Sequence, residues 1–169
     1  MTTENSVHRI WRLGSDIDTD QLAPGAYMQL GIAEIAPHCL ESVRPDFACG
    51  VNRGDVLVAG NNFGIGSSRE QAAAVLVFLG VKAVVAPSYS GLFFRNAFNV
   101  GLLLLTCAQA DELQEGEHIR LDLKTWQIHC GARPPLLCAP VPDFLMEIVS
   151  AGGLLNHLKA HQNNTREAH

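Results

Sequence analysis

The sequence predicts an α/β protein with a parallel βαβ core, followed by a β-hairpin and helices towards the C-terminus. Two observations carry this prediction. In the middle of the chain, short apolar runs alternate with helical segments that end at glycine. After residue 116, apolar and polar residues alternate on both sides of a turn, which is typical of a hairpin. Because 169 residues suit one domain of ordinary size, we expect residues 1–169 to form a single domain.

The segment before the core is predicted to hold one strand and one short helix. Residues 7–13 have the composition of a strand, and Pro24-Gly25 breaks any regular element that follows. Residues 31–40 favour a short helix, and residues 44–52 are expected to form a loop. The side chains expected to be buried in the first strand are Val7, Ile10, Trp11 and Leu13.

The core is predicted from three buried strands and the two helices between them. The strands are residues 55–60, 81–86 and 102–105, which are short and almost continuously apolar. The helices are residues 72–79 and 92–100, and each is followed by a glycine in the position that closes a helix. This order predicts parallel strands joined by right-handed crossovers.

The C-terminal part is predicted to contain a hairpin and two helices. Residues 117–123 and 126–130 would pair around Lys124-Thr125. Residues 143–150 and 154–161 have helical periodicity, with Gly152-Gly153 between them. Residues 162–169 are polar, and we expect them to form a frayed tail of the single domain.

Composition and charge exclude several classes of protein. The formal net charge is −5, so the chain lacks the basic surface that nucleic acids and anionic membranes require. Its apolar runs are far shorter than the roughly 20 residues that span a bilayer, and no secretory signal precedes residue 7. Charged residues are only 17% of the chain, against a usual share of about 25%, which predicts that a partner covers part of the surface.

The cysteines indicate a reducing compartment. Their number is odd and none lies in a C-x-x-C pattern, so neither a disulfide framework nor a local zinc or iron–sulfur site is expected. His157 and His161 are spaced i, i+4 but lie near a polar terminus, and we expect no metal in this chain. We therefore expect a cytoplasmic protein with free thiols at Cys39, Cys49, Cys107, Cys130 and Cys138.

The segment from Gly60 to Gln71 carries the strongest chemical signal. A buried strand leads into it, a helix follows, and Gly64 and Gly66 allow a sharp turn. Ser67 and Glu70 match a capping box, and the first amides of the helix together with Arg69 suit a small carboxylate. Two alternatives remain: a capped helix start with no ligand, and a nucleotide loop. The nucleotide loop is disfavoured because no Gly-Lys-Ser/Thr occurs and Arg69 replaces the third glycine of the dinucleotide pattern.

The run from Gly64 to Glu70, Gly-x-Gly-Ser-Ser-Arg-Glu, resembles the signature of the aconitase swivel domain. The order and spacing of the motifs are similar to the short form of the small subunits in the 3-isopropylmalate dehydratase family. The resemblance covers roughly residues 11–105. It also includes Asp16-Ile-Asp-Thr-Asp-Gln21, Ala86-Pro-Ser88, Phe93, Asn96, Asn99 and Gly101.

This resemblance implies a swivelling β/β/α domain and a hydro-lyase that is active only with a partner. In the family, a large subunit holds a [4Fe–4S] cluster, and the small subunit closes over the substrate, forming a heterodimer or heterotetramer. By position, Ser67 matches the serine that removes the substrate proton, and Asp20 matches an acid of the closed site. Arg69 matches the arginine that binds a substrate carboxylate, and Ser68 matches a serine that contacts substrate.

The resemblance also places the selection of substrate in the loop Tyr27–Gly31. This loop has no charge, which favours the isopropyl group of isopropylmalate over a third carboxylate. Tyr27, Met28 and Leu30 are the candidates for an apolar wall, with simple packing as the alternative. The expected reaction is the interconversion of 2- and 3-isopropylmalate in leucine biosynthesis. A related hydratase for citraconate, methylmalate or homoaconitate, and a non-catalytic anion-binding module, are the rival interpretations.

Several polar residues near these motifs have structural interpretations. Asp16 and Asp18 lack the glycine and distal glutamate of a calcium loop, so we expect them to act in a turn and as a helix cap. Arg95, Asn96 and Asn99 are expected to make hydrogen bonds around the Gly-Ser-Ser-Arg loop rather than to bind substrate.

Overall fold

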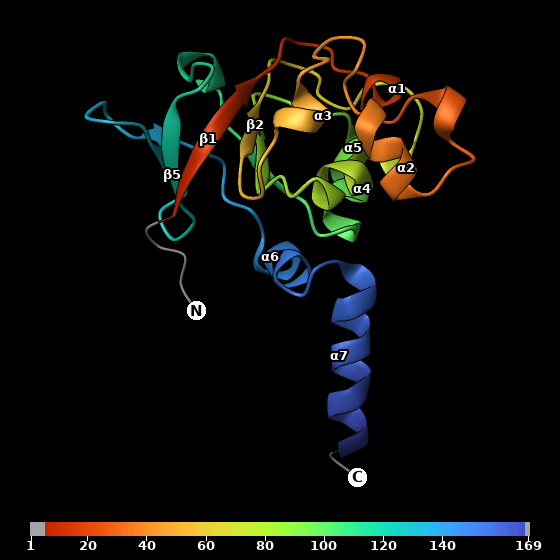
Figure 1. Cartoon of the computed structure of the whole chain (residues 1–169). Helices are drawn as coiled ribbons and strands as arrows, with labels where there is room; N and C mark the ends of the chain where they lie inside the picture. The colour runs from red at the N-terminus through yellow and green to blue at the C-terminus, as the bar shows by residue number, and fades with distance from the viewer. Residues whose placement is uncertain (1–5, 168–169) are drawn as a thin grey trace.

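A computed structural model describes residues 6–167 and the side chains as far as Gln162. Its centre is a seven-stranded sheet with the order β4-β3-β2-β1-β5-β6-β7 (Figure 1). The strands are β1 (Val7–Arg12), β2 (Val56–Val58), β3 (Ala83–Ala86), β4 (Leu103–Thr106), β5 (His118–Asp122), β6 (Gln127–His129) and β7 (Leu136–Leu137).

The described part of the chain also contains seven α-helices and three 3₁₀ turns. The helices are α1 (Thr19–Leu22), α2 (Ile32–Ile35), α3 (Phe47–Gly50), α4 (Glu70–Phe78), α5 (Gly91–Asn99), α6 (Asp143–Ser150) and α7 (Leu154–Glu167). The 3₁₀ turns are η1 (Gly25–Tyr27), η2 (Ala36–His38) and η3 (Ala110–Glu112).

The strands β1 to β4 form the parallel half of the sheet. β2, β3 and β4 are linked through α4 and α5, which confirms the predicted βαβ core. Leu57 lies opposite Val84, and Val84 lies opposite Leu104. Both crossovers advance in the same direction along the sheet, so right-handed connections place α4 and α5 on the same face. Helices α1 and α2 then pack against α4.

The strands β5 to β7 form the antiparallel half. β5 pairs with β1 and with β6, which confirms the predicted hairpin. β1 is therefore the strand that joins the two halves, because it is parallel to β2 and antiparallel to β5. β7 was not predicted, since its two residues are too few for a periodic signal.

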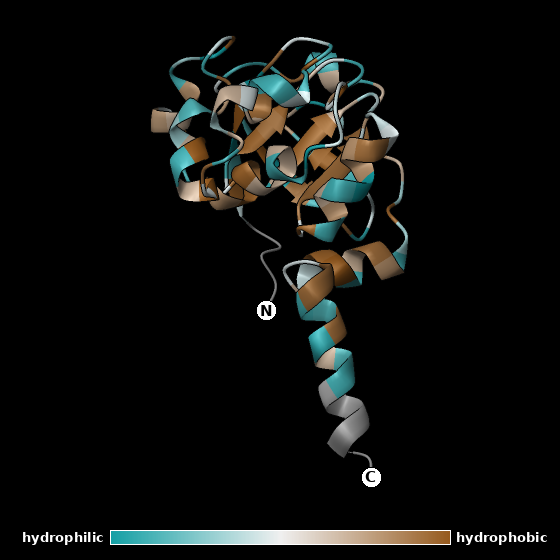
Figure 2. Ribbon diagram, turned by 90° about the vertical axis from the view of Figure 1, so that its right-hand side faces the viewer, coloured by the Kyte–Doolittle hydropathy of each residue, from teal (hydrophilic) through white to brown (hydrophobic). Residues whose placement is uncertain are grey.

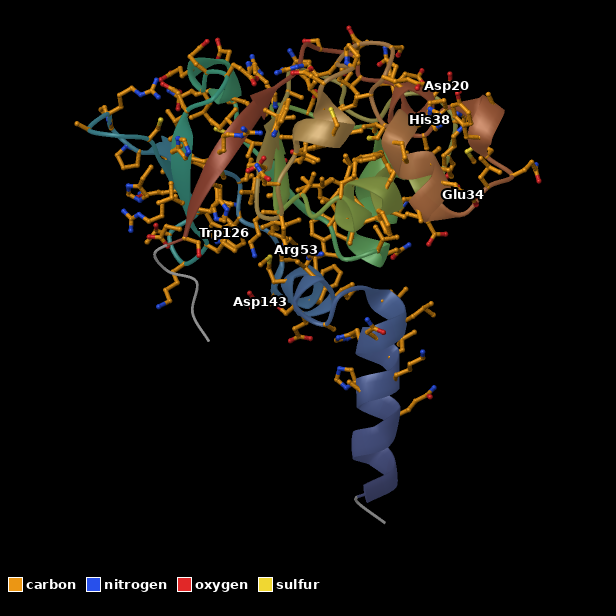
Figure 3. The ribbon with its side chains drawn as sticks, viewed as in Figure 1. Asp20, Glu34, His38, Arg53, Trp126 and Asp143 are labelled. Carbon is orange, nitrogen blue, oxygen red and sulfur yellow. The ribbon has the colours of Figure 1, made fainter. Side chains whose placement is uncertain are left out.

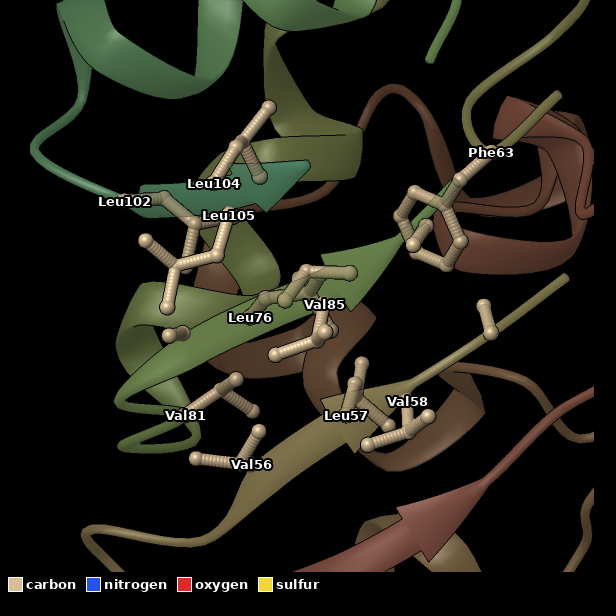
Figure 4. Close-up of a cluster of buried hydrophobic side chains, with 14 of the residues drawn as sticks. Val56, Leu57, Val58, Phe63, Leu76, Val81, Val85, Leu102, Leu104 and Leu105 are labelled. Carbon is tan, nitrogen blue, oxygen red and sulfur yellow. The ribbon is translucent and has the colours of Figure 1, made fainter. Parts of the chain in front are cut away.

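The hydrophobic core lies between the parallel strands and their covering helices. Leu57, Val84 and Leu104 are register partners on three neighbouring strands and are all buried, as is Leu76 of α4. Figure 4 shows Leu57, Leu76 and Leu104 among the side chains of this core. Figure 2 shows the apolar colouring concentrated on the strands inside the ring of helices, whereas α7 is mostly hydrophilic. All five cysteines are free, as expected from the sequence. No helix among residues 6–167 is both long and apolar enough to cross a membrane.

Three sequence predictions differ from the structure. Val7 is 63% exposed rather than buried, because the alternation of β1 turns His8 and Ile10 inward and Val7 to the opposite side. Residues 47–50 form the helical turn α3 instead of a loop, since Phe47 packs edge-on against Trp11 at 5.2 Å between ring centroids. Helix α7 continues to Glu167, beyond the predicted end at His161. The predicted fraying of the tail stays a prediction, and residues 168–169 lie outside the described part.

The turn after β2 depends on a close contact between Gly64 and helix α5. Gly64 has φ +81°, and a Cβ atom at this position would lie 2.2 Å from the ring of Phe93. Gly116 has a similar φ of +75°, but a Cβ atom there would have no neighbouring atom within 4 Å. The two glycines therefore share a backbone conformation and differ only in the space beside them.

We predict that Gly64→Ala destabilises the chain much more than Gly116→Ala. An alanine in left-handed backbone costs about 1–2 kcal/mol at either site, and forcing a methyl group into Phe93 adds about 1–3 kcal/mol at Gly64 alone. Urea unfolding of the two variants and the wild type measures this difference. Equal destabilisation of the two variants would show that the contact with Phe93 does not restrict position 64.

Candidate active site

The candidate site forms where the turns that follow β1 and β2 lie side by side. These parallel strands end at the same edge of the sheet, and the chain after each strand continues next to the other. The Asp16 amide donates to the Asn61 carbonyl at 2.8 Å, and the Gly64 amide donates to the Ile17 carbonyl at 2.7 Å. The Thr19 amide donates to the Ile65 carbonyl at 2.8 Å. Two motifs that are distant in the sequence thus form one surface.

Gly66 allows the closest part of this approach. Its φ is +96°, and a Cβ atom there would lie 2.7 Å from both carboxylate oxygens of Asp18. The buried Thr19 hydroxyl donates to the Ser67 carbonyl at 2.9 Å. The backbone at Ser67 is therefore fixed from inside the protein, while the Ser67 side chain is exposed.

The predicted capping box of Ser67 and Glu70 is wrong. Helix α4 begins at Glu70, its N-cap residue is Arg69, and no side chain caps it. The left-handed conformation of Gly66 and the bond from Thr19 hold Ser67 outside the helix. Within the described residues, the Ser67 hydroxyl therefore makes no capping hydrogen bond to helix α4.

A capping box does occur at the start of the neighbouring helix α1, in the segment Asp16–Gln21. The Asp18 carboxylate accepts from the Asp20 amide at 2.7 Å, and the Gln21 side chain accepts from the Asp18 amide at 2.9 Å. Asp16, which has φ +58°, accepts a hydrogen bond from the Asn62 side chain at 2.8 Å. The predicted capping and turn roles of Asp18 and Asp16 are confirmed.

Arg69 and Asp20 form the charged pair of the site. Arg69 Nη1 donates to Asp20 Oδ1 at 2.5 Å and to the Ala23 carbonyl at 3.0 Å. The same Asp20 oxygen accepts from the Gly25 amide at 2.8 Å. The hydrogen bond from Arg69, followed by that from Gly25, lowers the pKa of Asp20. Both of these bonds use Nη1, and within residues 6–162 no acceptor is hydrogen-bonded to the other guanidinium nitrogens of Arg69, so they are available to a carboxylate.

Ser68 lies next to this pair and contacts helix α5. Asn96 Nδ2 donates to Ser68 Oγ at 3.3 Å, which confirms a hydrogen-bonding role for Asn96 at this loop. In the described part of the chain, the side chains of Arg95 and Asn99 make no such bond to the loop, so their predicted role is not found. Ser68 itself is exposed.

The loop Tyr27–Gly31 is held at both ends. The ring of Tyr27 stacks on His38 at 3.7 Å between centroids, and His38 Nδ1 lies 2.7 Å from Glu41 Oε2. At the other end, the Gly31 amide donates to Glu34 Oε2 at 3.0 Å. Asp20 and His38 both lie in the part of the chain that carries α1 and α2 (Figure 3). The loop is therefore held by α2 and η2, the elements that follow Asp20 and helix α1 in the chain.

The candidate wall residues differ in their surroundings. Met28 is half-buried and packs against the core, as the alternative of simple packing predicts. Leu30 is 43% exposed and offers an apolar surface to a ligand. Sequence reasoning missed the contributions of Thr19 and His38, because both act through contacts with residues that are not their neighbours in the sequence.

Comparisons with known proteins agree with this architecture and identify the class of fold. The aconitase C-terminal domain family matches residues 46–110, which include the whole Gly-Ser-Ser-Arg turn. A solved structure of 3-isopropylmalate dehydratase from Methanocaldococcus jannaschii superposes with a TM-score of 0.90 at 37% identity. The superposition covers 96% of this chain and 98% of that one. The fold is thus the aconitase C-terminal type, a mixed α/β domain.

Sequence relatives then define the family. The 3-isopropylmalate dehydratase small subunit 1 of Thermotoga maritima is 41% identical over 90% of this chain and 94% of its own length. The methanogen homoaconitase small subunit of Methanothermobacter thermautotrophicus is 41% identical over 88% of each chain. The chain belongs to the family of 3-isopropylmalate dehydratase small subunits. Since the homoaconitase subunit is equally similar, overall identity does not separate the two substrates.

We predict that Asp20 titrates below the usual range of an aspartate and that Arg69 is the largest cause of this lowered pKa. Its pKa is lowered in the folded protein, so the Asp20–Arg69 bond is complete at neutral pH and is lost as the pH falls through that lowered pKa. Carboxyl ¹³C shifts during an acid titration measure the pKa, and Arg69→Gln should raise it. Arg44→Gln is the matched control, because Arg44 pairs instead with Asp46 and Glu115. An unchanged Asp20 pKa in Arg69→Gln would contradict the assignment.

Proposed function

We propose that this chain is the small subunit of a 3-isopropylmalate dehydratase and interconverts 2- and 3-isopropylmalate together with a large subunit. The reaction removes water from the substrate and adds it back in the other orientation, and it serves leucine biosynthesis. The observation that carries the proposal is the Arg69–Asp20 pair beside exposed Ser67 and Ser68 on a fixed turn. We propose the cytoplasm as the site of action, in keeping with five free thiols.

Arg69 is proposed to bind one substrate carboxylate. Asp20 and the Ala23 carbonyl hold one nitrogen of its planar guanidinium, which leaves the remaining N–H groups in a fixed orientation. A bidentate pair with a carboxylate adds both binding energy and orientation. Ser68, held by Asn96, would donate or accept a further hydrogen bond to the substrate.

Ser67 is proposed to accept the proton that leaves the substrate carbon. A serine hydroxyl is a weak base, so its alkoxide must be stabilised by nearby positive charge or amide donors. Arg69 lies two residues away, and the backbone of Ser67 is fixed by Thr19. The absence of a capping bond leaves the Ser67 oxygen available for this role. Asp20 is proposed as the acidic residue that completes the site, as a carboxylate paired with Arg69, when the partner closes over it.

The iron–sulfur chemistry is proposed to belong to the large subunit. Among the described residues, the cysteines do not gather into a group of three ligands, and only Cys49 is exposed. A [4Fe–4S] cluster in the partner would supply an iron that binds the substrate hydroxyl and carboxylate. This chain then supplies the carboxylate contact, the proton acceptor and the wall of the substrate pocket.

The choice of isopropylmalate rests on the loop Tyr27–Gly31. None of its side chains is charged, and Leu30 presents an apolar surface. A carboxylate that loses water without finding a partner costs several kcal/mol, on the order of the values for buried unpaired charge. An isopropyl group has no such cost and would contact Leu30 and Tyr27.

Reconstitution tests the function directly. We predict that the purified chain alone shows neither hydratase activity nor the visible absorption of an iron–sulfur cluster. Mixing it anaerobically with a reconstituted large subunit should produce turnover of 2-isopropylmalate. The measurement is the absorbance of the unsaturated intermediate with a panel of 2-hydroxy diacids. Activity of the single chain, or no activity of the mixture with any member of the panel, would contradict the proposal.

Ser67→Ala tests the proton acceptor. We predict that kcat of the reconstituted enzyme falls by about 10³-fold or more, the range lost with a general base. Because Ser67 is exposed and caps no helix, the stability of the chain should change by less than about 0.5 kcal/mol. Ser42→Ala, another exposed serine, is the control and should leave kcat unchanged. Near-normal turnover of Ser67→Ala would exclude Ser67 as the base.

Leu30→Arg and Gln29→Arg test the selection of substrate. Both side chains are exposed, so an arginine at either position can reach solvent or the closing pocket. We predict lower kcat/KM for isopropylmalate and higher kcat/KM for homoaconitate, because a bidentate arginine offsets the cost of a third carboxylate. Leu30→Met is the control and should retain the preference for isopropylmalate. A wild-type enzyme that already prefers homoaconitate would assign the chain to the homoaconitase group instead.

A further inference from the structure

Helix α7 projects from the body of the protein with little apolar burial (Figure 1). Leu155 is 73% exposed and Leu158 is 48% exposed. Among the side chains described after Leu154, only His157 is partly covered. A helix of 14 residues is marginal in water without tertiary contacts. Hydrophobic contacts therefore contribute little to holding α7 in place. The partly buried His157 marks the side of α7 on which a polar contact with the rest of the protein is to be sought.

The angle between α6 and α7 is set by glycine contacts at the end of α5. Gly152 and Gly153 make the turn with φ values of +78° and +115°. A Cβ on Gly153 would lie 2.8 Å from the Asn99 carbonyl oxygen, and a Cβ on Gly101 would lie 2.8 Å from the Gly152 carbonyl carbon. These backbone contacts leave little freedom in the turn, so the faces that α6 and α7 present to each other are fixed.

The turn brings three potential metal ligands together from two helices. Glu147 lies on α6, and His157 and His161 lie one turn apart on α7. One ligand atom from each of the three residues lies within 4.8 Å of the other two. The imidazole rings are 4.5 Å apart at an interplanar angle of 69°. An open groove of about 560 Å³ is lined by these three residues and by Asp143. Asp143 lies on α6, one turn before Glu147 (Figure 3).

We propose that Glu147, His157 and His161 bind a Zn²⁺ ion that fastens α7 to α6. Two imidazole nitrogens and a carboxylate oxygen are ligands that zinc prefers, and a fourth position would be filled by water or Asp143. Tetrahedral zinc with bonds of about 2.1 Å requires ligand atoms about 3.4 Å apart. The three ligand atoms lie within 4.8 Å of one another, and rotation of the exposed Glu147 and His161 side chains can close the difference. The ion would replace the apolar contacts that α7 lacks.

Metal titration of the tag-free, chelator-treated chain tests the proposal. Co²⁺ is the spectroscopic probe, because tetrahedral Co²⁺ absorbs visible light, and Zn²⁺ should displace it at one equivalent. His157→Gln combined with His161→Gln should weaken Zn²⁺ binding by at least about 100-fold, more than the loss of an outer-shell partner. Glu147→Gln, on the other helix, should also weaken it. His118→Gln with His129→Gln removes two imidazoles from the β5–β6 hairpin and should leave binding unchanged.

Amide hydrogen exchange provides a readout of the structural role. In the wild type, Zn²⁺ should slow exchange across residues 154–167, and it should not do so in the variant lacking both α7 histidines. Circular dichroism checks that the variants stay folded, which we expect because Glu147 and His161 are exposed. No Co²⁺ or Zn²⁺ binding by the wild type would overturn the proposal. Undiminished binding by the variant without His157 and His161 would also overturn it, because the ion would then bind elsewhere.

Discussion

The contact between the turns after β1 and β2 is the constraint on which the site depends. Backbone hydrogen bonds join the two turns: the Asp16 amide donates to the Asn61 carbonyl, and the Thr19 amide donates to the Ile65 carbonyl. Gly66 has no side chain, so the Asp18 carboxylate can lie against it, and Gly64 accommodates Phe93 in the same way. Without these approaches, the acidic motif and the Ser-Ser-Arg turn would lie on separate loops. With them, Ser67 has a fixed backbone and a side chain free for chemistry.

The Arg69–Asp20 bond extends this arrangement to the loop Tyr27–Gly31, which we propose faces the variable part of a substrate. Asp20 accepts hydrogen bonds from both Arg69 and the Gly25 amide, so it joins the Ser-Ser-Arg turn to the segment just before the loop. Asp20 is 60% exposed, and a pair this open to water contributes little to stability. The bond instead fixes the orientation of the Arg69 guanidinium. When a partner covers the site and excludes water, the same charges interact more strongly with a bound carboxylate.

Helix α5 contacts both the Ser-Ser-Arg turn and the glycine turn between α6 and α7. Phe93 in its first turn lies against Gly64, and Asn96 in its second turn donates to Ser68. Its last residue, Asn99, contacts Gly153, and the glycine turn there sets the direction of α7. One nine-residue helix thus contacts both the Ser-Ser-Arg turn and the glycine turn that precedes α7. The candidate active site and the proposed zinc site therefore share α5 as a common support, although their own residues lie on other elements.

The sequence by itself determined the strands, the helices and the motif of the site. Apolar periodicity and closing glycines are local signals, so they placed β2, α4, β3, α5 and β4 within a few residues and predicted the hairpin. The resemblance placed Ser67, Ser68, Arg69 and Asp20 in one site. Only the tertiary structure decided that Ser67 caps nothing, that Asp20 holds Arg69, that Phe47 forms a helical turn against Trp11, and that Glu147 meets His157 and His161. Each of these depends on which distant segment lies against a residue, and no pattern within a window of neighbouring residues contains that information.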